Sequence, residues 1–358
     1  MQKLIMSSSF LLFCFSFFCF PINSSSNKWT GTIIDAHSQY GCKTDGEDIL
    51  YAIRTFGVKK TLLSARGGCS KDETPIESQL RTLNLVKDLK KKADFFISSK
   101  LAGLGHPGEG NKITGLKWFV EADKLFFKNS IGFGEIIVQH ADHDHAALTR
   151  EGLQSNLESS RIKKVISVML KRKKPVILHL ELNDSEKSSS TVLSQLRRLL
   201  KNYPQHNFVL IHMAQASAVE VMELVRNFPN IYFLTSHTNA LNEVGKIKRK
   251  RIGEVAQKGW INLFNVLQKG APYRGWFKEY FVTMRWKEKW KNLFVQFPDR
   301  FVFAMDNVFA KHWRKKRYQM VINIWRKAFS QLPKEVAVKV SCENANRLWN
   351  LKVTCLAK

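Results

Sequence analysis

The sequence predicts an α/β protein whose single domain is a (β/α)8 TIM barrel. Eight short runs rich in Val, Ile, Leu and Phe lack polar alternation, which is typical of parallel strands buried on both faces. Helix-like patterning fills most of the gaps between them, and the chain length suits one barrel of this class. The predicted strands are Thr32–His37, Val58–Ser64, Asp94–Lys100, Ser130–Ile137, Pro175–Leu182, Asn207–His212, Asn230–Ser236 and Arg300–Asp306.

Amphipathic segments between and after these strands are the predicted outer helices. We expect the barrel to cover residues 30–355. The stretch 239–299 has the least regular pattern, and we expect it to form a lid or rim over the barrel mouth. The predicted helices are Ile76–Lys92, Leu116–Lys128, Leu157–Lys171, Thr191–Asn202, Ala218–Phe228 and Trp313–Phe329.

Five residues able to bind a metal or move a proton stand at or near the downstream ends of predicted strands. In a parallel barrel the carboxyl ends of all strands meet at one mouth, where the following loops diverge and catalytic residues collect. Five such residues at that end indicate a metal-dependent hydrolase. They are His37, Glu135, His179, His212 and Asp306.

The order and spacing of these residues resemble the amidohydrolase superfamily. The segment 35–39 (DAHSQ) is similar to its first-strand D-x-H-x-H motif, and Gly134-Glu135 is similar to its fourth-strand acidic position. His179 and His212 resemble its fifth- and sixth-strand histidines, and Asp306 resembles its eighth-strand aspartate. The ending 343–349 (ENANRLW) resembles the N-A-x-R-L-F signature of the amidohydrolase-related (amidohydrolase 2) branch. The resemblance runs from about residue 33 to residue 351, and it implies a metal-dependent TIM-barrel hydrolase.

The resemblance also implies roles for the five strand-end residues as metal ligands, with one departure. The second histidine of the first-strand pair is Gln39 here, and a carboxamide oxygen is a weak and uncommon zinc ligand. Glu135, His179 and His212 keep two imidazoles and one carboxylate, which is a known catalytic zinc set. We therefore expect one divalent ion, Zn²⁺, with no ion as the alternative. Asp306 is expected to deprotonate the attacking water, and His212 is the second catalytic candidate.

Three further residues are candidates for substrate contact: His140, Glu181 and Gln39. The loop 139–145 (QHADHDH) follows the fourth strand and would hang over the site, although a solvated polar loop is the alternative. His140 lies nearest to the strand end in this loop. Glu181 points to the same strand face as His179, where a structural salt bridge is an equal alternative.

The N-terminus predicts export. Lys3 precedes an apolar stretch, Phe10–Ile22, which is followed by Asn23 and three serines. A short positive region, an apolar core of about a dozen residues and a small-residue exit describe a secretory signal peptide. We expect it to occupy residues 1–25 and the protein to be secreted or periplasmic.

Four cysteines lie outside that segment, at positions 42, 69, 342 and 355. An oxidising compartment permits disulfides, and four cysteines allow three pairings between which sequence cannot choose. A Cys42–Cys69 bridge at the barrel mouth is one expectation, because both residues would lie in loops after the first two strands.

The formal net charge is +27, with basic runs at 246–251 and 311–317. Such a balance favours attraction to anionic surfaces, but a solvated lysine-rich surface is the preferred explanation. No zinc finger, Walker loop or Rossmann fingerprint is present, so no nucleotide cofactor is indicated. We expect a small-molecule substrate rather than nucleic acid.

Several functions follow from these observations. The leading one is an exported metal-dependent hydrolase of a small ester, lactone, amide or related carboxylic derivative. A metal-independent lactonase-like hydrolase is the first alternative, because Gln39 weakens one metal position. A barrel that has lost catalysis and binds a ligand or an anionic surface is another. A TatD-like phosphodiesterase or nuclease shares the fourth-strand Gly-Glu, but the ending of the chain resembles the amidohydrolase-related branch better.

Overall fold

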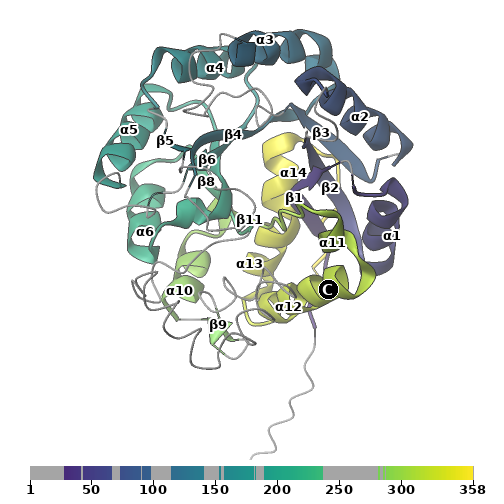
Figure 1. Ribbon diagram of the computed structural model, residues 1–358. Helices are drawn as coiled ribbons and strands as arrows, with labels where there is room; N and C mark the ends of the chain where they lie inside the picture. The colour runs from purple at the N-terminus through teal and green to yellow at the C-terminus, as the bar shows by residue number, and fades with distance from the viewer. Residues whose placement is uncertain are drawn as a thin grey trace, which may run out of the picture.

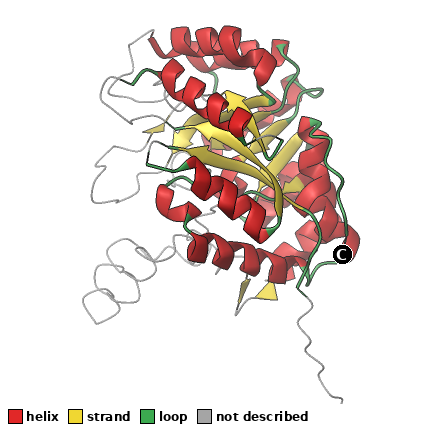
Figure 2. Cartoon of the chain, turned by 90° about the vertical axis from the view of Figure 1, so that its right-hand side faces the viewer, coloured by secondary structure: helices red, strands yellow, loops and turns green. Residues whose placement is uncertain are grey.

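The computed structural model describes residues 28–41, 43–66, 73–89, 91–97, 114–140, 153–154, 157–180, 182, 189–236, 281–282, 285–286 and 288–357. Eight parallel strands form a nearly closed barrel in the order β1-β2-β3-β4-β6-β7-β8-β11. Helices alternate with the strands, and most of them lie around the outside of the sheet (Figures 1 and 2). The predicted (β/α)8 TIM barrel is therefore confirmed.

Every predicted strand of the barrel is present, although most boundaries differ by a few residues. The barrel strands are β1 (Ile33–Tyr40), β2 (Val58–Ala65), β3 (Ala93–Ile97), β4 (Gly132–His140), β6 (Val176–Leu180), β7 (Phe208–Leu210), β8 (Ile231–Leu234) and β11 (Phe301–Val302). Two short additions are antiparallel: β5 (Leu153–Gln154) pairs with β4, and β9 (Phe281–Val282) pairs with β10 (Arg285–Trp286).

The described helices include each of the six predicted ones, together with α1 and the helices near the C-terminus, which the sequence analysis did not predict. Their starts carry clear capping signals. Asp45 caps α1, and Thr74 with Glu77 forms a capping box on α2. The helices are α1 (Gly46–Phe56), α2 (Pro75–Asp88), α3 (Thr114–Phe126), α4 (Ser160–Lys171), α5 (Ser189–Asn202), α6 (Ala218–Asn227), α10 (Glu288–Gln296), α11 (Ala310–Trp313), α12 (Lys315–Phe329), α13 (Lys334–Val338) and α14 (Asn344–Trp349).

Backbone hydrogen bonds join the first strand to the chain that follows the last one. The amide of Ala36 donates to the carbonyl of Phe303 at 3.0 Å, and the amide of Asp306 donates to the carbonyl of His37 at 2.8 Å. Gln39 continues the pattern by donating its amide to the carbonyl of residue 307 at 3.0 Å. This seam closes the barrel and brings Asp306 beside His37.

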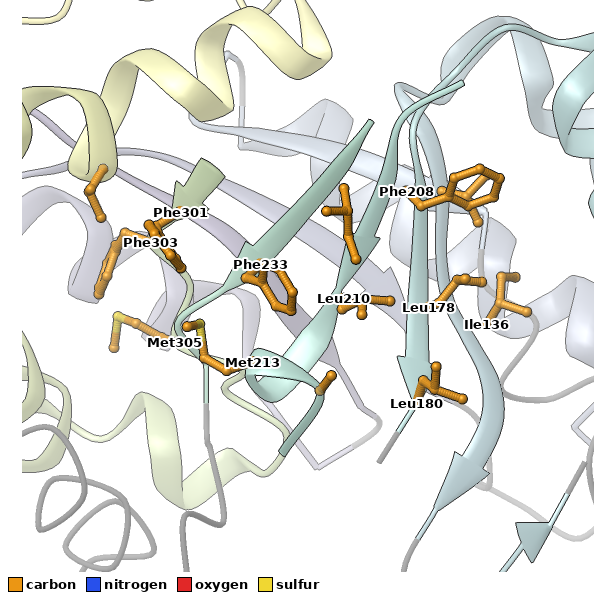
Figure 3. Packing of buried hydrophobic residues seen from close by; sticks show 14 of the residues in the cluster. Ile136, Leu178, Leu180, Phe208, Leu210, Met213, Phe233, Phe301, Phe303 and Met305 are labelled. Carbon is orange, nitrogen blue, oxygen red and sulfur yellow. The ribbon is translucent and has the colours of Figure 1, made fainter. Parts of the chain in front are cut away.

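The core has two apolar layers, one on each face of the sheet. The layer between strands and helices includes Leu178 on β6, Leu210 on β7, Phe233 on β8 and Phe303 after β11, which follow one another across the sheet (Figure 3). A second buried layer fills the barrel interior. Strands that bury both faces carry continuous apolar runs, which is the pattern that the sequence shows. The inner layer consists mainly of Ile34, Ala36, Leu62, Phe96, Ile177, Val209, Ile211, Leu234, Val302 and Ala304.

Helix α14 packs into the inner layer near the start of β11, at the amino end of the barrel. The side-chain amide of Asn344 donates to the carbonyls of Pro298 and Phe301, at 2.7 and 2.8 Å. Trp349 is buried and packs edge-on against Phe96, with ring centroids 5.6 Å apart. Figure 1 shows α14 within the ring of strands. The segment 343–349 therefore stabilises the end of the barrel opposite the mouth.

A disulfide bond joins Cys342 to Cys355 and fixes the chain on both sides of α14. Its Cα atoms are 5.7 Å apart, and the two residues are separated by 13 positions in the sequence. The expected Cys42–Cys69 bridge lies outside the described residues. Of the three possible pairings, the observed bond belongs to the one that leaves Cys42 and Cys69 for each other.

The last part of the range 239–299 belongs to the outer wall of the barrel. Helix α10 contacts α6, and Trp286 beside it packs against Trp325 of α12 with ring centroids 6.2 Å apart. Most of the remainder of that range lies outside the described residues, so the lid or rim stays a prediction. Among the described helices, none has the length and apolar character needed to cross a membrane.

Candidate metal centre

Three of the residues that the sequence singled out meet at the barrel mouth: Glu135 on β4, His179 on β6 and His212 after β7. Each offers one ligand atom, and these atoms lie within 4.8 Å of one another. All three side chains are buried. The structure thus brings together the two imidazoles and one carboxylate that were expected to form a zinc set.

Glu135 and His179 are neighbours because β4 and β6 pair directly. Ile137 lies opposite His179 in the parallel register, and Nδ1 of His179 contacts Oε1 of Glu135. Gly134 permits the close approach of the two strands. A Cβ atom at this position would lie 2.8 Å from Cβ of Ile177, which is closer than real side chains come. Glycine before the glutamate is therefore a packing requirement of the site.

His212 projects from a left-handed turn that directly follows β7. His212, Met213 and Ala214 have φ angles of 58°, 52° and 56°, a conformation that costs about 1–2 kcal/mol per non-glycine residue. Nδ1 of His212 lies 3.3 Å from the carbonyl oxygen of Ser236, to which it can donate its proton. Nε2, the other ring nitrogen, then faces Oδ2 of Asp306 at 3.7 Å and is the atom that would bind a metal. Ser236 thus orients the imidazole.

Asp306 lies between two histidines. Oδ1 is 3.3 Å from Nδ1 of His37, and Oδ2 is 3.7 Å from Nε2 of His212. Burial alone would raise the pKa of this carboxyl group, but the hydrogen bond and positive charge of His37, helped by His212, outweigh burial and lower the pKa below its ordinary value. Asp306 is therefore held as a carboxylate. Its φ of 51° places it, like His212, in the left-handed region.

Gln39 joins two of the carboxylates. Its Nε2 donates to Oε2 of Glu135 at 3.1 Å and to Oδ1 of Asp306 at 3.0 Å. Both acceptors are carboxylate oxygens, so the nitrogen end of the amide must face them. The sequence analysis treated Gln39 only as a weak ligand or a substrate contact, and it missed this bridging position.

Asp35, on β1, supports the chain on both sides of Asp306. Its Oδ2 accepts a hydrogen bond from Oγ of Ser38 at 2.6 Å, and its Oδ1 accepts one from the amide of Met305 at 2.8 Å. Oγ of Ser38 in turn accepts from the amide of Asn307 at 3.1 Å. Complete burial raises the pKa of the Asp35 carboxyl group to about 7, against the lowering effect of these hydrogen bonds. The side chain fixes the β1–β11 seam on either side of Asp306.

The donor set fits a small divalent ion. Ligand atoms around a tetrahedral zinc stand about 3–3.5 Å apart, given metal–ligand bonds of about 2.0–2.2 Å. The three atoms lie within 4.8 Å of one another, so modest side-chain movement brings them to that spacing. Glu135, His179 and His212 would hold the ion, while Asp306 lies beside Nε2 of His212.

Two predicted substrate contacts are not placed by the structure. His140 is the last residue of β4, but its side chain lies outside what is described. Glu181 and the loop 141–145 lie outside the described residues altogether. Their roles stay predictions.

No protein-family model matches the sequence, and no curated protein matches it. Solved structures do match. Dihydroorotase from Campylobacter jejuni has 12% sequence identity and a TM-score of 0.53, with 92% of this chain and 86% of that chain covered. Dihydroorotase from Saccharomyces cerevisiae, in complex with 5-fluoroorotic acid, has 12% identity and a TM-score of 0.50, with 90% and 84% covered.

A Burkholderia multivorans amidohydrolase with bound zinc has 11% identity and a TM-score of 0.48, covering 89% of this chain and 99% of that one. These solved structures are TIM barrels of the amidohydrolase superfamily. At such low identity the likeness of the dihydroorotases shows a shared fold, and function has to be argued from the site itself.

Proposed function

We propose that this chain is an exported metal-dependent hydrolase that acts on a small ester, lactone, amide or related carboxylic derivative. The observation that carries the proposal is the buried cluster of Glu135, His179 and His212 beside the Asp306 carboxylate. It stands at the carboxyl ends of the strands, the end of a TIM barrel where catalytic sites lie. The fold shared with the dihydroorotases is compatible with this chemistry, but it does not identify the substrate of this chain.

The residues have separate tasks in the proposed reaction. Glu135, His179 and His212 would hold a divalent ion, which would supply the Lewis acidity that acidifies water and polarises a carbonyl oxygen. Asp306 accepts the proton of the attacking water, because its lowered pKa keeps it ionised near neutral pH. His37 stabilises that carboxylate from the opposite side, at 3.3 Å.

Metal content and hydrolysis test the proposal together. Purified protein should contain one divalent ion per chain and hydrolyse members of a panel of activated esters and lactones. His179→Ala and His212→Ala should lose both the ion and the activity. His206→Ala is the matched control, since His206 is also buried but packs against Phe208 away from the cluster. Unchanged metal content in the first two variants would refute the assignment.

A metal-independent hydrolase is the second candidate, and one feature favours it. The acidic groups already have donors within the chain: Glu135 contacts His179 and Gln39, and Asp306 contacts Gln39 and His37. Hydrolysis that persists after complete metal removal would select this candidate. Hydrolysis that disappears with the metal and returns on its addition would select the first.

Export is part of the proposal and is supported by the Cys342–Cys355 disulfide, because such bonds persist in oxidising compartments. The apolar N-terminal segment supplies the independent motivation. N-terminal sequencing of protein isolated from its host should find a chain that starts near residues 24–27. A cytosolic protein that still begins at Met1 would contradict export and leave the chemistry untouched.

A further inference from the structure

The amide group of Gln39 lies among three groups that otherwise suit a cation. Its Nε2 is 3.1 Å from Oε2 of Glu135 and 3.0 Å from Oδ1 of Asp306. The same Oδ1 is 3.3 Å from Nδ1 of His37. All four side chains are buried. Two carboxylates and an imidazole around one point form a donor set that divalent ions accept.

Burial makes this arrangement of two carboxylates unfavourable unless another group offsets their repulsion. Two carboxylates close together in a buried site repel each other and need a positive or hydrogen-donating group between them. An amide nitrogen carries two N–H donors and no charge, so it can hydrogen-bond to both carboxylates while excluding an ion from the same space. Gln39 supplies that group from β1.

We propose that the Gln39 amide takes the place of a second metal ion, so that the centre binds a single ion and Asp306 stays unligated. This inference rests on the proposed function for the first ion only. In this arrangement Gln39 is a positioning residue: it holds Asp306 through Oδ1 and leaves Oδ2 directed toward His212. Asp306 then acts as a carboxylate base rather than as a metal ligand.

Gln39→Glu is the sharpest test, because the two side chains have nearly the same shape. The change converts two donor hydrogen bonds into contacts between carboxylates. The introduced carboxylate, with Glu135, Asp306 and His37, then forms a site that requires a cation. We expect the variant to bind one more divalent ion per chain than the wild-type protein does. Gln39→Leu removes the donors without adding a ligand, so it should gain no ion and should melt at a lower temperature as the metal-free protein.

The measurement is metal stoichiometry of the full exported chain after loading with excess Zn²⁺ or Mn²⁺ and removal of free ion. Electron paramagnetic resonance of the Mn²⁺ form adds a second readout: two ions that share carboxylates should show exchange coupling, whereas one ion should not. Gln79→Glu is the matched control. Gln79 is equally buried but lies in α2 outside this cluster, so its variant should gain no coupled ion.

The outcomes separate this inference from the proposed function. An increase from one ion to two supports both. An increase from none to one supports the role of Gln39 and refutes the proposed metal centre of the wild-type protein. If Gln39→Glu does not fold, Gln39→His places an imidazole at the same position and should also gain one ion. A folded Gln39→Glu or Gln39→His variant without an additional ion would overturn the inference.

Discussion

Replacing Asp306 by Asn separates its role as a base from its role in the structure. Oδ1 accepts from Gln39 and lies near His37, whereas Oδ2 lies near Nε2 of His212. Asparagine can keep its carbonyl oxygen at the Oδ1 position and so retain the first two contacts. Its NH₂ group then takes the Oδ2 position, which faces the His212 ring. Shape and packing are conserved, while the charge and the capacity to accept a proton are lost.

The expected loss is kinetic. A positioned general base contributes about 10²–10⁴-fold, so kcat/KM should fall by that factor, or about 2.7–5.5 kcal/mol in transition-state stabilisation. Metal content should remain near one ion per chain, because Glu135, His179 and His212 are unchanged. The assay is hydrolysis of the best ester or lactone in the panel, with metal analysis and thermal melting of the same samples.

A suitable control is Asp299→Asn, whose side chain is exposed and pairs with Lys339 near the start of β11. It should retain activity. Full activity in Asp306→Asn would show that another group takes the proton. Parallel loss of metal and activity would show instead that Asp306 is a ligand, which would contradict the division of roles proposed for the site.

Three further predictions concern stability. Replacing Cys342 and Cys355 together by Ala should lower the free energy of unfolding by about 2–4 kcal/mol, measured by denaturant titration, and an unchanged value would mean that the bond adds nothing. Because the pKa of Asp35 is raised to about 7 in the folded protein, the folded state binds this proton more tightly. The free energy of unfolding of the metal-free protein should therefore fall as pH rises from about 4 to about 7, by on the order of 4 kcal/mol, and Asp35→Asn should remove this fall. Metal at 100 times its dissociation constant should raise the free energy of unfolding by about 2.7 kcal/mol, an increase that must disappear in His179→Ala if the ion binds where we propose.

The barrel could be predicted from the sequence because strands buried on both faces leave a plain signal. Runs such as Asn207–His212 and Arg300–Asp306 are apolar between their polar end residues, and the structure places strands within both. Their ends were less predictable, since β7 has three residues and β11 has two. Pairing with neighbours, rather than local preference, decides where a strand stops. Helix α1 was missed although Asp45 and Gly57 mark its two ends.

The gathering of the candidate ligands was also predictable, because the position of a residue at a strand end fixes which end of the barrel it occupies. Glu135, His179 and His212 were named from that rule, and they meet. The bridging role of Gln39 was not predictable in the same way. Its amide reaches Glu135, which is 96 positions away, and Asp306, which is 267 positions away. Such contacts depend on the rotation of each side chain within the closed barrel.

Backbone conformation explains why the sequence pattern does not predict that His212 and Asp306 face each other. Side chains in a strand alternate between the two faces, but His212 and Asp306 both leave that alternation by adopting positive φ angles. Neither is glycine, so each conformation costs free energy that the surrounding structure must offset. Two hydrogen bonds stabilise the turn around His212. The amide of Leu182 donates to the carbonyl of Ala214, and the amide of His212 donates to Oγ of Ser236. The left-handed turn points Nε2 of the imidazole toward Oδ2 of Asp306. The strain at these two residues is thus part of what builds the centre, because two ordinary strand ends would not set this imidazole and this carboxylate face to face.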